Sequence, residues 1–376
     1  MEELAMQFKK SFQPVIYFIL GLFACCLTVS FVHADQLSKQ IDHMSLQDKI
    51  AQMYFVPSDG NQNDVLNAIQ QYHVGGVVLF GADFQNQTSN QFKTKLDRWQ
   101  KASQIPLFIG TDQEGGTVSR LSDNPQLTNN RQFPSPQALN NNMQTEVNEA
   151  RNVAEILHNL GINWNFAPVA DVSNNPQSFI YPRTFGKDYQ QTATYISKVV
   201  PAIQSQKVVA TLKHFPGYGT ADDTHTGFAS TNKSLADFQS QDFLPFIAGI
   251  KSHVDAVLIS HIVIDQVDNH YPASLSPQVH RILRDQLHFK GVIITDDLGM
   301  GAITQFAQDN HVNADVLAVE AGNDMLLSKN YQTGIPAIEQ AVKNHQISEK
   351  QINQSVYRIL KLKEKIGLIK EGVTKR

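Results

Sequence analysis

Acidic, basic and imidazole side chains recur along this 376-residue chain at one kind of position, the end of a short apolar run. Asp296 and Asp297 end the run that begins at Gly291, and Asp112 ends the run that begins at Pro106. A carboxylate in such a place can serve as a nucleophile or a general base. The alternative for the Asp pair is a cap on the turn that follows.

A second chemical pair lies in a long polar segment, residues 216–233, which contains three glycines. Asp223 and His225 are two residues apart, so an Asx-type turn can bring the carboxylate to the imidazole. That contact would orient the ring and favour a proton on it, which suits the imidazole to give a proton and then take it back. A Gly-containing loop of this length can also close over a site as a lid. The competing interpretation is a mobile polar loop whose histidine has no role.

The other polar residues at run ends each have an ordinary structural interpretation. Taken singly, Asp112 and Asp171 are typical of loop caps. Lys213 and His214 could be a surface pair, and His261 a hydrogen-bonded structural histidine. Five successive apolar runs nevertheless end in such groups. Because burying so many polar groups is costly unless they meet a ligand or each other, their grouping favours a functional site.

Eight apolar, β-branched runs alternate with amphipathic helical patterns, which predicts an α/β fold with a single (β/α)8 TIM-type barrel. A doubly wound sheet would need a Gly-rich turn after its first strand, and Val56-Pro-Ser-Asp-Gly60 is not one. A barrel places its site at the carboxyl ends of its strands, where the polar groups lie. The predicted strands are 51–56, 75–80, 106–112, 162–168, 208–215, 256–264, 291–297 and 324–328.

Composition limits the classes of function. Hydrophobic residues make up 41% of the chain, enough for a large core, and the net charge of −4 gives no electrostatic footprint for nucleic acid. No Pro- or Gly-rich linker divides residues 35–376, so we expect one domain there. Helical patterns run over 135–160, 188–206, 235–253, 276–287 and 348–368, and Ser234 begins one as a capping residue.

The first 34 residues have the order of a secretory signal peptide. Lys9 and Lys10 precede an apolar run over 15–32, and the small residue Ala34 follows. We therefore predict cleavage after Ala34 and an exported protein, secreted or held at the cell surface. The run is long for a signal peptide, so an uncleaved N-terminal membrane anchor is the alternative.

The two cysteines of the chain, Cys25 and Cys26, both lie inside this apolar run. Cleavage after Ala34 would remove both, which leaves no disulfide and no thiol chemistry. The sequence also shows no cluster of metal ligands with the spacing of a known site. We therefore predict an enzyme without a metal or cofactor.

The chemistry-bearing segments together resemble glycoside hydrolase family 3, and its bacterial β-N-acetylglucosaminidase branch most of all. The resemblance covers about residues 36–370. Members of this branch can consist of the barrel alone. The segments that carry the resemblance are Met44-Ser-Leu-Gln-Asp-Lys-Ile-Ala-Gln-Met53, Asp112-Gln-Glu-Gly-Gly116, Asn165-Phe-Ala-Pro168, Arg183-Thr-Phe-Gly186, Lys213-His-Phe-Pro-Gly-Tyr-Gly219, Asp223-Thr-His225, Pro272-Ala-Ser-Leu-Ser276 and Ile294-Thr-Asp-Asp-Leu298.

The resemblance implies a role for each matching residue. Asp296 corresponds to the catalytic nucleophile, His225 to the histidine acid/base and Asp223 to its carboxylate partner. Two positions depart from the family, since Tyr218 stands where a second histidine is usual and Thr117 where an arginine is common. The residues implied to hold the hydroxyls and the N-acetyl group of the sugar are Asp112, Arg120, Arg183, Lys213, His214 and His261.

The implied activity is retaining hydrolysis of terminal, non-reducing β-linked GlcNAc. The expected substrates are peptidoglycan fragments or chitin-type oligosaccharides, with no nucleic-acid partner and no membrane partner beyond the export segment. Alternatives are a β-glucosidase or a GlcNAc phosphorylase of the same family, or a sugar-binding barrel without activity. The sequence leaves the oligomeric state open.

Overall fold

The computed structural model describes residues 36–139 and 142–370. The predicted export segment, residues 1–34, lies outside the described residues, so the signal peptide and the alternative anchor both stay predictions. Within the described ranges, no helix is long and apolar enough to cross a membrane.

The eight strands expected from the sequence all form, and they build one parallel barrel. They are β1 (Tyr54–Pro57), β2 (Gly76–Leu79), β3 (Phe108–Thr111), β6 (Trp164–Asn165), β7 (Val209–Phe215), β9 (Ala256–Ile259), β12 (Val292–Thr295) and β13 (Leu326–Leu327). Their order in the sheet is β12-β9-β7-β6-β3-β2-β1-β13. A parallel bridge from Ile294 to Met325 brings the two ends of the sheet together. The predicted α/β fold with eight parallel strands is therefore confirmed as a nearly closed barrel, with shorter strands than expected.

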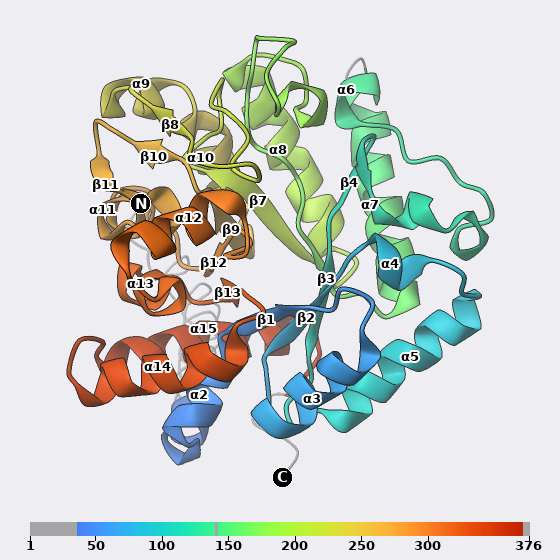
Figure 1. The fold of residues 1–376 in the computed structure, drawn as a ribbon. Coiled ribbons are helices and arrows are strands. Elements are labelled where there is room, and N and C mark those ends of the chain that lie inside the picture. Colours follow the sequence, from blue (N-terminus) through green and yellow to red (C-terminus); the bar gives the residue numbers. More distant parts are fainter. Residues whose placement is uncertain (1–35, 140–141, 371–376) are drawn as a thin grey trace, which may run out of the picture.

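Helices surround the strands, as Figure 1 shows for α3, α5, α7, α8 and α14. Ser234 caps α9 as expected, because its Oγ accepts the Asp237 N–H at 3.1 Å. The helices are α2 (Leu46–Gln52), α3 (Gln62–Tyr72), α4 (Gly81–Phe84), α5 (Ser89–Ala102), α6 (Pro136–Leu139), α7 (Met143–Leu160), α8 (Tyr189–Gln204), α9 (Leu235–Ser240), α10 (Phe243–Lys251), α11 (Pro277–Arg281), α12 (Gly301–Asn310), α13 (Ala314–Ala321), α14 (Tyr331–Lys343) and α15 (Glu349–Lys365).

Two predicted strands include residues that belong to a different element of the structure. Residues 51 and 52 belong to α2, which Ser45 caps by accepting the Asp48 N–H at 3.0 Å. The predicted strand 256–264 leaves the barrel after Ile259, and β10 (Val263–Ile264) instead joins a small sheet with β8 (Ser230–Thr231) and β11 (Asp268–Pro272). Both errors have one cause, since a continuous apolar run does not reveal which buried element it belongs to.

Aromatic side chains from three strands pack together in the barrel core. The rings of Phe108 and Trp164 pack edge to face with their centres 4.7 Å apart, and the centres of the Phe55 and Trp164 rings are 5.3 Å apart. The indole N–H of Trp164 donates to Thr211 Oγ1 at 2.8 Å, so its one polar atom is satisfied. A Cβ at Gly110 would lie 2.8 Å from the Phe55 ring, which explains the glycine on β3. This cluster makes the core apolar below the polar ends of the strands.

A buried lysine faces the same cluster from α15. The side chain of Lys363 is fully buried, its Nζ donates to Gln52 Oε1 at 2.8 Å, and it lies 5.1 Å from the centre of the Phe108 ring. Burial lowers the pKa of Lys363 from 10.5 to about 7. Because the unfolded chain binds this proton more tightly, Lys363 makes stability rise with pH between about 7 and 10.5.

We predict that Lys363→Met raises the free energy of unfolding most at low pH. At about 1.4 kcal/mol per pKa unit, placing the charged lysine in the core costs several kcal/mol, and methionine removes that cost. Urea unfolding at about pH 6 and pH 10 measures the difference, which should be large at the lower pH and small at the higher. Lys361→Met, at an exposed position of the same helix, should change stability by less than about 0.5 kcal/mol at both. Equal effects of Lys363→Met at the two pH values would contradict the prediction.

Candidate active site

A cavity of about 570 Å³ opens among the carboxyl ends of the barrel strands. Its wall combines charged residues with the aromatic rings of Phe80, Phe166 and Phe179. Eight of the nine site residues expected from the sequence line it, namely Asp112, Arg120, Arg183, Lys213, His214, Asp223, His225 and Asp296.

The Asp pair after β12 is divided between two environments. Burial alone would raise the pKa of Asp296, but the charges of His214 and His261 and the Asp297 N–H, which donates to Asp296 Oδ1 at 2.9 Å, hold that pKa below its ordinary value. Asp297 instead accepts the Gly299 N–H at 2.8 Å, and burial together with the neighbouring Asp296 raises its pKa to about 6. Asp296 is therefore the carboxylate of the pair that stays ionised to lower pH, and a nucleophile must be ionised.

A buried ion cluster lies beside Asp296. Lys213 on β7 contacts Asp112 Oδ1 at 2.7 Å and Glu114 Oε1 at 2.6 Å. Arg183, at the end of the 3₁₀ turn η3 (Tyr181–Arg183), donates to both oxygens of Glu114 at 2.9 and 2.7 Å. Burial would raise the pKa of Glu114, but the two cations outweigh it and lower that pKa to about 2. Sequence reasoning missed Glu114, although it stands inside the quoted segment that begins at Asp112.

His214 is held by a carboxylate that the sequence analysis noted without assigning it a role. Oδ2 of the fully buried Asp171 accepts the His214 backbone N–H at 3.0 Å and lies 2.7 Å from His214 Nδ1. The other oxygen of Asp171 accepts the Tyr218 N–H at 2.7 Å. His214 Nε2 then lies 3.3 Å from Arg183 Nη2, at the cavity wall. Asp171 thus orients the imidazole.

The predicted Asx turn forms in the loop after β7. Asp223 Oδ1 accepts the His225 N–H at 3.0 Å and lies 2.6 Å from His225 Nδ1. The His225 side chain is 55% exposed, and the ring of Phe179 meets it edge-on at 5.7 Å. Among the described residues no hydrogen bond to its Nε2 is seen, so a ligand in the cavity can meet this nitrogen. When the ring is protonated, the Asp223 carboxylate can stabilise its positive charge.

Arg120 and His261 are placed differently from each other. Arg120 lines the cavity and stacks on Phe80 at 5.9 Å, and its Nε is buried without a partner among the described residues, as expected of a donor awaiting a ligand. His261 is fully buried, with Nδ1 on Ser274 Oγ at 2.8 Å and Nε2 on the Asp297 carbonyl at 2.9 Å. Protein atoms therefore engage both nitrogens of His261, and its predicted contact with the sugar stays a prediction.

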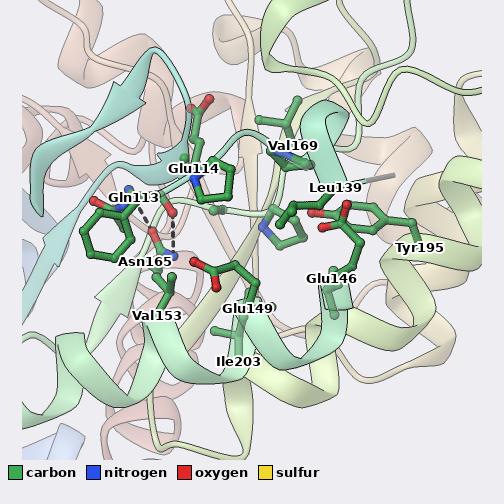
Figure 2. A pocket seen from close by; sticks show the side chains of 18 residues that line it. Gln113, Glu114, Leu139, Glu146, Glu149, Val153, Asn165, Val169, Tyr195 and Ile203 are labelled. Carbon is green, nitrogen blue, oxygen red and sulfur yellow. Dashed lines mark hydrogen bonds between the residues drawn. The ribbon is translucent and has the colours of Figure 1, made fainter. Parts of the chain in front are cut away.

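A second, smaller cavity of about 50 Å³ is lined in part by Glu114 of the ion cluster. Figure 2 shows Glu146 and Glu149 projecting from α7, with Tyr195 beside Glu146. Within the described ranges, neither Glu146 Oε1 nor Glu149 Oε1 has a hydrogen-bond partner. Burial, helped by Glu149, raises the pKa of Glu146 to about 8, so it is protonated at neutral pH. The space has room for water molecules that would satisfy these oxygens.

Comparison with known proteins places the chain in a family. The pattern of the glycosyl hydrolase family 3 N-terminal domain matches residues 45–362. The chain belongs to glycosyl hydrolase family 3. It is 34% identical over 267 residues to a beta-hexosaminidase of Xanthomonas oryzae pv. oryzae, covering 69% of this chain and 77% of that one. It is 31% identical over 334 residues to beta-hexosaminidase A of Pseudoalteromonas piscicida, covering 79% of this chain but 54% of that protein.

Solved structures agree with this family. A glycoside hydrolase family 3 β-N-acetylglucosaminidase from Paenibacillus has a TM-score of 0.79 at 30% identity, over 86% of this chain and 63% of that one. LpqI of M. tuberculosis has a TM-score of 0.77 at 27% identity, over 87% and 96%. The chain therefore spans about half to two thirds of some relatives and nearly all of others.

We predict that Glu114→Gln lowers the free energy of unfolding by about 3–5 kcal/mol, because it leaves Lys213 and Arg183 as buried charges with too little compensation. Urea unfolding at neutral pH measures the loss. Glu339→Gln is the matched control, since Glu339 pairs with a Lys343 side chain that is 59% exposed, and it should lose less than about 0.5 kcal/mol. Equal losses in the two variants would argue against a structural role for Glu114.

Proposed function

We propose that this chain is a retaining exo-β-N-acetylglucosaminidase. The observation that carries the proposal is an ionised Asp296 and an Asp223-bonded His225 lining one cavity with a cluster of cations. A nucleophilic carboxylate and a separate proton donor are the two groups that a retaining glycosidase needs.

The reaction follows in two displacements. Asp296 attacks the anomeric carbon while protonated His225 gives its proton to the departing oxygen, and the glycosidic bond breaks. The neutral imidazole then takes a proton from water as that water attacks the glycosyl–Asp296 ester, which releases the sugar and restores both groups. Asp223 stabilises the imidazolium and holds Nδ1, so that the other nitrogen handles the proton.

The cluster around Lys213 supports the choice of a sugar. Lys213, Arg183 and Arg120 supply donors for hydroxyl and acetamido oxygens, and Asp112 supplies an acceptor. These groups lie on strand ends and short turns rather than on the loop that carries His225. We propose GlcNAc at the end of peptidoglycan fragments or chitin-type oligosaccharides as the natural substrate.

Phosphate as the acceptor is the second candidate. A neutral imidazole does not repel an anionic acceptor as a second carboxylate would, so phosphorolysis would use the same groups. Product analysis with added phosphate separates the two, because hydrolysis gives free GlcNAc and phosphorolysis gives GlcNAc 1-phosphate.

We expect Asp296→Ala to abolish release of aryl alcohol from aryl β-GlcNAc, and a fluorinated sugar to label Asp296 rather than Asp297.

His225→Ala should lower kcat/KM about 10²–10⁴-fold for unactivated leaving groups and much less for dinitrophenyl, which needs no proton. His270→Ala, an exposed histidine on β11, should have no effect. Binding of GlcNAc without turnover of any aryl glycoside would support the non-catalytic barrel, and faster turnover of aryl glucosides would support a β-glucosidase.

We further propose that the enzyme works outside the cytoplasm, with residues 1–34 removed as a signal peptide. This rests on the order of charged, apolar and small residues in the sequence. Mass spectrometry of the native protein should find Asp35 at its N-terminus. A native protein that retains residues 15–32 and partitions with membranes would support the anchor instead.

A further inference from the structure

In the proton-donating pair His225 is exposed and Asp223 is half-buried, but the residue between them is fully buried. Thr224 is fully buried, while the side chain of His225 is 55% exposed. A catalytic imidazole on a loop must return to one position in each turnover, because proton transfer requires hydrogen-bond distance. The contacts of Thr224 therefore decide where His225 lies.

Tyr218 holds Thr224 in place through both its backbone and its side chain. Its phenol oxygen accepts the Thr224 backbone N–H at 3.0 Å and lies 2.7 Å from Thr224 Oγ1. Tyr218 is itself fixed, since it is 3% exposed and its backbone N–H donates to Asp171, which also holds His214. Tyr218 thus links two parts of the site, since its phenol holds the loop of His225 and its backbone N–H holds the carboxylate that orients His214.

The N-terminus of α12 holds the other side of the loop. Ala302 N–H donates to the Thr224 carbonyl at 3.2 Å, and Gly301 N–H to the His225 carbonyl at 3.3 Å. This helix begins five residues after Asp296, so the element that follows the nucleophile also seats the proton donor. The loop carbonyls satisfy backbone donors that a helix start leaves open.

Gly301 is where the loop and the helix come closest. A Cβ there would lie 2.8 Å from the His225 carbonyl oxygen and 3.1 Å from Gly227 N. The Gly301 backbone does not lie in the left-handed region, so alanine suits the helix itself and conflicts only with the docked loop. The glycine is therefore explained by the seated position of the loop.

We propose that Tyr218 and Gly301 are positioning residues that hold the Asp223–His225 pair in its proton-transfer position; the inference rests on the proposed function. The nucleophile and the sugar-binding cations lie on strand ends and short turns that make none of the contacts to Thr224 or Gly301. Loosening the loop should therefore impair proton transfer to the leaving group and leave the attack by Asp296 and the binding of the sugar intact.

The test is kcat/KM for aryl β-GlcNAc substrates that range from dinitrophenyl to unsubstituted phenyl. We expect Tyr218→Phe to lower kcat/KM about tenfold or more for phenyl and less than about twofold for dinitrophenyl, so that the dependence on the leaving group steepens toward that of His225→Ala. Adding Tyr218→Phe to His225→Ala should change kcat/KM less than about twofold, because the two residues act on one step. Tyr357→Phe, on α15, is the control for loss of a phenol hydroxyl.

A glycine pair tests the same idea without touching the phenol. Gly301→Ala should steepen the leaving-group dependence as Tyr218→Phe does. Gly227→Ala should not, since a Cβ at Gly227 meets nothing within 4 Å. Unfolding midpoints within experimental error of the wild type would show that Gly301→Ala leaves the fold intact.

The outcomes separate the two proposals. If His225→Ala steepens the dependence while Tyr218→Phe and Gly301→Ala leave it unchanged or lower kcat/KM equally for all leaving groups, the positioning role is wrong and the proposed function stands. If His225→Ala itself leaves the dependence unchanged, the proposed function fails first.

Discussion

The site depends on the burial of one carboxylate, Glu114, between two cations. Lys213 and Arg183 would repel each other if they stood alone in the barrel mouth, and burying their charges without a partner would be costly. Glu114 compensates both and fixes their direction through three contacts of 2.6–2.9 Å. Held in this way, the two cations can donate hydrogen bonds to a sugar. The charge of Lys213 also helps to keep Asp296 ionised.

The two halves of the proposed chemistry are positioned by different means. Asp296 and Lys213 stand at or next to barrel strands, whose hydrogen-bonded neighbours on both sides leave little freedom. His225 stands on a loop, where Asp223, Tyr218 and α12 replace the sheet as its support. A proton donor on a loop can move as a substrate enters and leaves the cavity, while the proposed nucleophile stays in place.

The barrel buries two lysines, Lys213 and Lys363, in different surroundings. Aromatic rings around Trp164 fill the space below the polar strand ends, so the buried charges of the site lie near one end of the barrel. Lys363 faces that ring cluster with an amide oxygen and an aromatic ring as partners instead of a carboxylate. Burial therefore depresses its pKa, whereas Lys213, buried as deeply but paired with Asp112 and Glu114, has a raised one.

The sequence by itself determined the barrel and most of its site. Eight apolar runs alternating with helical patterns leave few ways to bury both faces of each strand, and polar residues that end those runs must meet at one rim. The two-residue spacing of Asp223 and His225 was enough to predict their contact, because an Asx turn is local. Only the tertiary structure decided that Glu114 and Asp171 are the partners of the cations and of His214, that His261 is occupied by protein atoms, and that Thr224 is anchored by Tyr218 and α12. Most of these contacts join residues far apart in the chain, so no local sequence pattern predicts them. Their strength depends on how deeply the side chains are buried and how they are oriented, and both are set only when the barrel forms.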